Sequence, residues 1–134
     1  MKLDDLPPKQ ALYLLLTELN SRQNTDRLRH YAPYPKQAEF HAAGKWARER
    51  LLRAGNQNGK TYCAGMETAM HLTGIYPDWW EGRRWDRPIV CWAGSDTGET
   101  TRGNPQRALI GPVGEIGTGC IPKRLIGTHK LAMG

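Results

Sequence analysis

The chain has 134 residues, of which 39% are hydrophobic and 24% charged, a composition that predicts one globular domain and excludes a disordered tail. Its formal charge of +6, from 19 Lys and Arg against 13 Asp and Glu, favours a polyanionic partner. Three scattered cysteines argue against a disulfide framework or a zinc site. The lack of a long apolar run or a basic leader leads us to expect a cytoplasmic protein.

The first thirty residues are predicted to form an N-terminal helix and a linker. Pro7 and Pro8 precede leucines at helical spacing, so an amphipathic helix is expected to end near Asn20. Its apolar face is formed by Leu12, Leu15, Leu16 and Leu19. The polar and basic segment Ser21–Arg29 is predicted to be a linker or a poorly buried turn.

Residues 31–134 are predicted to begin an α/β domain. Prolines 33 and 35 exclude a regular helix before Lys36, where a second helix is expected to place Phe40, Ala43 and Ala47 on one face. A short strand over Glu49–Arg53 follows.

A third helix is predicted over Lys60–Thr73, with Gly74 well placed to end it. Its inward residues are expected to be Cys63, Met66, Ala69 and Met70.

The second half is predicted to contain one more strand and one more helix. Tyr76–Arg87 is an aromatic and basic loop, and Ile89–Ala93 has the compact apolar character of a strand. Asn104-Pro105 resembles the start of a short helix ending at Ile110, and Gly111–Pro122 is expected to be loop. Alternating strands and helices predict an incomplete parallel sheet with flanking helices, of the type found in phosphate-loop NTPases.

The segment from 54 to 61 fits the phosphate-binding loop, in which a small residue is followed after four positions by Gly-Lys-Thr. Glycines let backbone N–H groups approach a phosphate, lysine supplies a charge to the β- and γ-phosphates, and the hydroxyl of Thr61 is a ligand for Mg²⁺. The predicted ATP- and Mg²⁺-binding residues are Ala54, Gly55, Asn56, Gln57, Asn58, Gly59, Lys60 and Thr61. The alternative is a surface turn that happens to precede Lys-Thr.

Blocks around this loop resemble, in order and spacing, the large subunit of tailed-phage terminases. The matching blocks are Tyr34–Phe40, Ala54–Thr61, Met70–Pro77, Trp80–Trp85, Trp92–Ser95 and Asn104–Leu109. These proteins are ATP-driven motors that package double-stranded DNA into capsids. The resemblance implies the N-terminal part of the ATPase domain, with a small terminase subunit and a portal protein as partners of the whole motor.

The resemblance also implies a role for Gln37, which stands where these motors read the adenine edge with a glutamine. A glutamine amide both donates and accepts, so this role is chemically reasonable, although a polar residue at a helix start needs no ligand. Many terminases carry an arginine at the position of Asn56. A catalytic charge would then come from Arg53, Arg83, Arg84 or a neighbouring subunit, a choice that the sequence leaves open.

The acidic Walker B strand, its catalytic glutamate and the nuclease domain of the resembled family do not follow Pro122. Asp96 is a poor substitute as a magnesium ligand, because Gly94 and Ser95 separate it from the predicted strand. No catalytic residue is therefore assigned, and ATP hydrolysis by this chain is expected to be slow. We expect the N-terminal piece of a terminase, from a shortened prophage gene or an expressed fragment.

Two other functions stay open from the sequence. One is a nucleotide-binding module of another kind, such as a helicase-like protein. The other is a catalytically inactive prophage remnant that binds nucleic acid or a capsid partner through Trp79–Arg87. Aromatic residues beside arginines stack on bases, but they more often form a packed loop braced by cation–π contacts, which is the structure we predict here.

Overall fold

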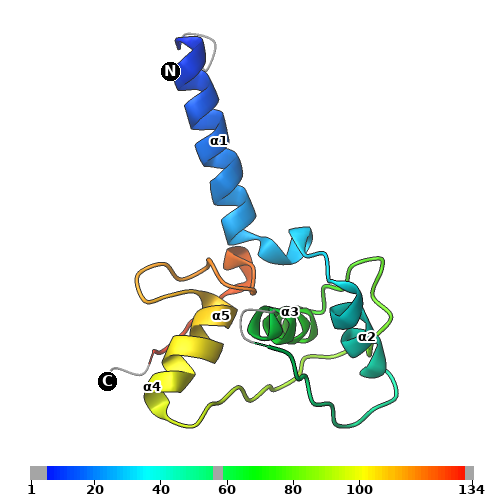
Figure 1. The fold of residues 1–134 in the computed structure, drawn as a ribbon. Coiled ribbons are helices and arrows are strands. Elements are labelled where there is room, and N and C mark those ends of the chain that lie inside the picture. The colour runs from blue at the N-terminus through cyan, green and yellow to red at the C-terminus, as the bar shows by residue number, and fades with distance from the viewer. Residues whose placement is uncertain (1–5, 56–58, 132–134) are drawn as a thin grey trace.

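The computed structural model describes residues 6–55 and 59–131, and its regular structure within these ranges is helical (Figure 1). The prediction of an α/β fold with a parallel sheet is wrong, because no strand forms in the described ranges. The segments predicted as strands, Glu49–Arg53 and Ile89–Ala93, have no regular structure and share no backbone hydrogen bond. A β-strand needs a second strand alongside to pair its backbone groups, so an apolar run alone does not produce one.

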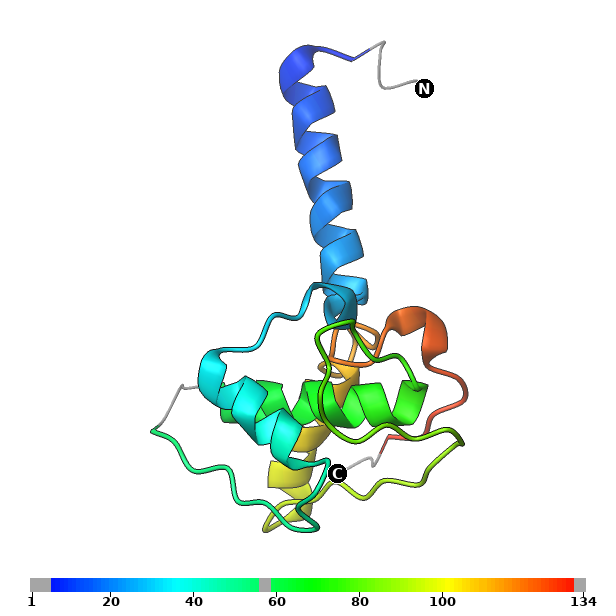
Figure 2. The ribbon, with the colours of Figure 1, turned by 90° about the vertical axis from the view of Figure 1, so that its right-hand side faces the viewer.

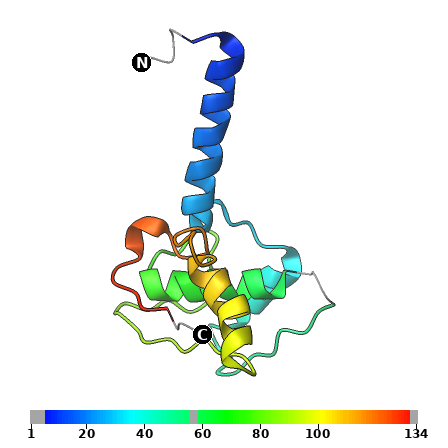
Figure 3. The same ribbon diagram turned by 90° about the vertical axis from the view of Figure 1, so that its left-hand side faces the viewer.

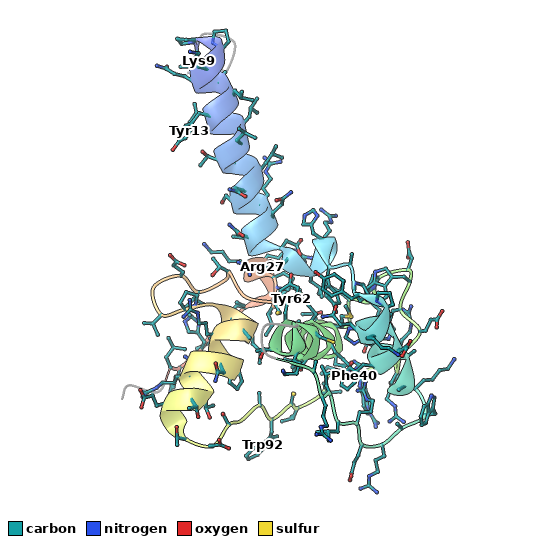
Figure 4. All side chains as sticks on the ribbon, viewed as in Figure 1. Lys9, Tyr13, Arg27, Phe40, Tyr62 and Trp92 are labelled. Atoms are coloured by element: carbon teal, nitrogen blue, oxygen red, sulfur yellow. The ribbon has the colours of Figure 1, made fainter. Side chains whose placement is uncertain are left out.

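Apolar side chains of these two segments face solvent. Leu51 is 81% exposed, Val90 87% and Trp92 95%. Figure 4 shows Trp92 directed away from the helices. The sequence pattern therefore identified apolar segments correctly, but it assigned them to a buried sheet that the described residues do not form.

The first helix, α1 (Pro8–Thr25), projects from the rest of the molecule (Figure 1, Figure 2 and Figure 3). It begins with a proline, as predicted, but it continues beyond Asn20, and no residue in it is buried. The predicted apolar face is thus present but uncovered, with Leu12, Leu15, Leu16 and Leu19 each about half exposed. None of the described helices is both long enough and apolar enough to span a bilayer.

The predicted linker Ser21–Arg29 instead completes α1 and enters a 3-10 turn, η2 (Arg27–His30). Leu28 of this turn is 4% exposed and belongs to the core. One apolar residue in a basic segment therefore anchors the foot of α1 to the body of the protein.

The helix α2 (Pro35–Ala43) starts one residue before its predicted start. Its buried residues are Gln37 and His41, whereas the predicted inward residue Ala47 lies beyond its end. The helix turns a polar edge inward because the core beside it contains hydrogen-bonding partners, a condition that apolar spacing does not reveal.

The helix α3 (Lys60–Thr73) has the predicted bounds, and Gly74 ends it in the left-handed conformation with a φ of 70°. The four residues predicted to point inward are all completely buried: Cys63, Met66, Ala69 and Met70. In Figure 1 this helix lies between α2 on one side and the later helices on the other. The core forms around it, with Leu28, Tyr31, Trp80 and Cys120 as the other buried members.

A continuous helical segment follows, made of α4 (Gly98–Thr101), a π-helical turn η3 (Arg102–Gln106) and α5 (Arg107–Ile110). The prediction that Asn104-Pro105 opens this helix is wrong, because Thr97 caps it seven residues earlier by accepting a hydrogen bond from Thr100 N at 3.1 Å. Pro105 lies inside the π-helical turn, where its missing N–H disrupts the α-helical ladder.

The loop after α5 is held against it by backbone hydrogen bonds. Cys120 N donates to Ala108 O at 2.8 Å and Ile121 N donates to Leu109 O at 2.9 Å. The last element, the 3-10 turn η4 (Lys123–Leu125), follows the fully buried Pro122. This arrangement brings η4 to the foot of α1 (Figure 3).

Candidate functional site

The helix α3 starts where the predicted phosphate loop ends. Gly59 is the residue before the helix and adopts the left-handed conformation, with φ 70° and ψ 20°. Its carbonyl accepts the first helical hydrogen bond from Cys63 N at 2.9 Å. The first turn of any α-helix leaves backbone N–H groups without an acceptor in the helix, and these groups favour an anion. Of the predicted loop residues, Asn56, Gln57 and Asn58 lie outside the described ranges.

The ammonium group of Lys60 lies over the first residues of the loop. Its Nζ atom donates to Ala54 O at 2.6 Å and to Gly55 O at 2.7 Å. Both acceptors are exposed, so the charge sits at the surface. Two neutral carbonyl oxygens orient this charge without neutralising it, and an anion is therefore a stronger partner for it.

The structure brings Gln37 against the loop, although 22 residues separate it from Gly59. Its Nε2 atom donates to Gly59 O at 3.3 Å, and its Oε1 atom accepts from Tyr34 N at 2.9 Å. Gln37 is 7% exposed, whereas Tyr34 is 71% exposed. The glutamine thus links the start of α2 to the start of α3, while its predicted role at the adenine edge stays a prediction.

Thr61 is exposed and lines two neighbouring cavities of about 570 and 480 Å³. Both cavities are shared with the segment around Asn104, and one also contains Arg107, a cation near Thr61 that the sequence did not single out. Asp96 lines neither of them. Within the described ranges, His, Cys, Asp and Glu form no group of three that would hold a metal ion. Magnesium at Thr61 therefore stays a prediction that depends on phosphate oxygens for the other ligands.

The aromatic loop has the packed structure that the sequence predicted. Arg83 lies 5.3 Å from the centre of the Trp85 ring, and Arg84 lies 5.2 Å from that of Tyr76. Trp80 is buried, and its indole N–H donates to Arg83 O at 3.0 Å. These two arginines therefore brace their own loop.

A buried polar network, which the sequence did not predict, is centred on Glu67 of α3. The carboxylate of Glu67 is 7% exposed and accepts from His41 Nδ1 at 2.7 Å and from His71 Nε2 at 3.4 Å. Arg50 donates to both oxygens of the same carboxylate. Every buried side-chain nitrogen and oxygen of the described residues has a hydrogen-bond partner.

The network extends in two directions from Glu67. His41 Nε2 and the hydroxyl of Tyr31 lie 2.9 Å apart, while His71 Nδ1 lies 3.0 Å from the hydroxyl of Tyr76. Burial raises the pKa of Tyr31 well above its usual range. The network therefore joins α2, α3 and the aromatic loop through one carboxylate.

The charge of Glu67 makes the stability of the protein depend on pH. Burial alone would raise the pKa of its carboxyl, but hydrogen bonds from His41, His71 and Arg50 and the charge of Arg50 lower it well below its usual value of 4.5. A carboxyl with a lowered folded pKa contributes stability that is complete above the unfolded pKa and is lost as the pH falls towards the folded pKa.

We therefore expect the urea midpoint of unfolding to fall steeply below about pH 4.5, the pKa of the unfolded carboxyl. Tryptophan fluorescence measured in urea from pH 3 to pH 7 checks this expectation. The Glu67→Gln variant should show a flatter profile over the same range, because it lacks the titrating group. Parallel profiles for the parent and the variant would show that other carboxyls cause the acid sensitivity.

Comparison with known proteins identifies a relative of the chain. The chain is related to the large subunit of phage terminases, so the predicted resemblance is confirmed. It is 40% identical over an alignment of 145 residues to the protein named terminase, large subunit, of Salmonella phage P22. The alignment covers 96% of this chain and 29% of that protein, so the chain spans under a third of the length of its relative. No family model and no solved structure matches the chain.

Proposed function

We propose that this chain is the ATP-binding segment of a terminase large subunit, a motor that packages double-stranded DNA into phage capsids. The relationship over nearly the whole chain supports the DNA-packaging role. The observation that carries the nucleotide-binding part is the start of α3, where Lys60 follows the left-handed Gly59 and extends its ammonium over the loop.

The residues at this start suit a triphosphate. The backbone N–H groups of the first turn and the positive end of the helix dipole favour the phosphate oxygens. Lys60 would exchange its two carbonyl acceptors for the β- and γ-phosphates, which bind an ammonium more strongly because they are charged. Magnesium, when bound with the nucleotide, would bridge phosphate oxygens and take the hydroxyl of Thr61 as a ligand.

Gln37 has a second role in this proposal. Both polar atoms of its amide are bonded within the protein, to Gly59 and to Tyr34. Adenine recognition therefore requires the Nε2 atom to exchange its long contact of 3.3 Å with Gly59 for one with the base. Until that exchange, the side chain stays hydrogen-bonded to Gly59 at the end of the predicted loop.

The relationship to terminases also suggests the partners of the whole motor. These are double-stranded DNA, a small terminase subunit and a portal protein. They would act with a complete large subunit, of which the chain corresponds to under a third in the P22 relative.

Titration of the 134-residue chain with a fluorescent ATP analogue and Mg²⁺ tests the nucleotide-binding proposal. We expect Lys60→Ala to weaken binding by about tenfold or more, since tenfold corresponds to about 1.4 kcal/mol, the size of one charge-assisted hydrogen bond. Lys45→Ala is the matched control, because Lys45 is exposed and lies outside the predicted loop. Equal affinity of Lys60→Ala and the parent would refute the proposed site.

A further inference from the structure

A basic groove lies at the foot of α1, away from the phosphate loop. Three segments form it: the end of α1, the turn η2 and the turn η4, which is about a hundred residues later in the sequence. The groove encloses about 620 Å³. It is lined by Leu19, Arg22, Gln23, Thr25, Asp26, Arg29, His30, Lys123 and Arg124. In Figure 1 the turn η4 lies directly beside the lower end of α1.

The positive charge in this groove is mostly uncompensated. Four of the lining side chains are Lys or Arg, against a single acid, Asp26. Arg22 is bound to Glu18 at 2.8 Å on the exposed side of α1. The side chains of Arg29, Lys123 and Arg124 form no hydrogen bond, ion pair or cation–π contact within the described ranges.

The two walls of the groove are fixed in position by buried residues. Leu28, buried in the core, holds the turn that carries Arg29. Pro122 is fully buried immediately before Lys123, and its carbonyl accepts from Leu125 N at 2.9 Å. The aliphatic stem of Lys123 packs against Gly117, where an added Cβ atom would clash with that stem. The backbone at both walls is therefore held by the fold, while the charged groups face solvent.

We propose that this groove binds the phosphodiester backbone of double-stranded DNA. Several unpaired cations held close together repel one another, and a row of phosphates removes that repulsion while releasing counterions from the DNA. Arginine forms paired hydrogen bonds with phosphate oxygens, and the groove offers two arginines without an internal partner. Contacts of this type do not depend on base sequence, which suits a protein that must move along any DNA.

The proposal rests on the proposed DNA-packaging function for its choice of DNA as ligand, but it does not use the phosphate loop. Each of the two proposals can therefore be refuted without refuting the other. Lys60→Ala should lose nucleotide affinity and keep the DNA affinity of the parent, because Lys60 does not line the groove.

Fluorescence anisotropy of a short labelled DNA duplex, titrated with the 134-residue chain at several salt concentrations, tests the groove. The test variant is Arg29→Gln, Lys123→Gln and Arg124→Gln combined. The control variant removes three exposed lysines elsewhere: Lys9, Lys36 and Lys45, each replaced by Gln. Both variants lose the same net charge, so a difference between them reports position and not total charge.

We expect the test variant to bind DNA about tenfold more weakly than the control variant. The slope of log affinity against log salt should fall by about 2 to 3 in the test variant, since each lost phosphate contact removes about 0.9. Equal weakening by the two variants would overturn the proposal. A second result would overturn it as well: full displacement of DNA by inorganic phosphate, at an ionic strength where sodium chloride does not displace it, would indicate a small-anion site.

Unfolding of the test variant would not leave the proposal untested. Lys123→Arg keeps the charge and should keep the salt slope of the parent, while Lys123→Gln alone should lower the slope by about 1. Circular dichroism verifies that both single variants are folded. Equal slopes for these two folded variants would argue against Lys123 as a phosphate contact and against the groove.

Discussion

We expect Glu67→Gln to lower the free energy of unfolding by about 3 kcal/mol or more, because the removal of one partner from a buried ion pair leaves the other uncompensated. The substitution keeps the size of the side chain and removes only its charge. Its new NH₂ group would face donors, since Arg50 and His41 both give hydrogen bonds to the present carboxylate. One donor must then stay unpaired in a site that is 7% exposed.

Urea denaturation followed by tryptophan fluorescence measures this effect, because Trp79 and Trp80 lie near His41. Glu39→Gln is the matched control: Glu39 forms an ion pair with Lys36 in which both side chains are more than half exposed. Such surface pairs contribute about 0 to 1 kcal/mol. Similar losses in the two variants would contradict the central role of Glu67 in the core.

The second large effect is expected at Met66. Met66→Ala should destabilise the protein by about 2 to 5 kcal/mol, because it removes a completely buried side chain and leaves a cavity between α3 and the residues around it. The surrounding side chains come from η2, the aromatic loop and the segment after α5, so one substitution weakens contacts from most of the chain.

Leu16→Ala provides the contrast in the same measurement. Leu16 lies on the predicted apolar face of α1 but is 56% exposed, so its truncation should change stability by less than about 0.5 kcal/mol. A loss of several kcal/mol from Leu16→Ala would indicate that α1 is covered in solution, which the structure does not show. A loss below about 1 kcal/mol from Met66→Ala would contradict the core described here.

The central helix of the fold could be predicted from the sequence with its bounds and its buried face. The reason is local: Gly59 and Gly74 mark its ends, and apolar residues recur between them at helical spacing. The start of α1 was predictable in the same way from its prolines. Features determined by residues within a few turns of the chain could thus be predicted from the sequence.

The sheet was predicted wrongly because pairing of strands is not a local property. Leu51 and Val90 lie in apolar segments that resemble strands, but no pairing partner lies beside either segment in the described residues. The prediction that a helix starts at Asn104-Pro105 was wrong for a different reason. Thr97 and Thr100 form a reciprocal cap, so the helix starts before the Asn-Pro pair, although that pair is the stronger sequence signal.

The candidate site, like the fold, could be predicted from the sequence only in part. The phosphate-loop spacing predicted Lys60 and Thr61, and the resemblance to terminases added Gln37, which the structure brings next to Gly59. The network around Glu67 left one weak signal in the sequence, the spacing of four residues between Glu67 and His71 on a helix. Its other members come from distant segments, so their meeting depends on the tertiary fold.

The projecting helix α1 has a mechanical consequence. With 18 residues at a rise of 1.5 Å each, it is a rod of roughly 27 Å. Asp26, with φ −142° and ψ 58°, is the single non-helical residue between this rod and the anchored turn η2. A rotation of about 10° at that joint would swing the far end by roughly 5 Å while displacing the foot very little, given the length set by the helical rise. The helix is therefore a lever whose pivot coincides with the basic groove. A force applied in the groove would act close to the pivot, whereas a force applied at the distal leucines would act with the full length of the arm.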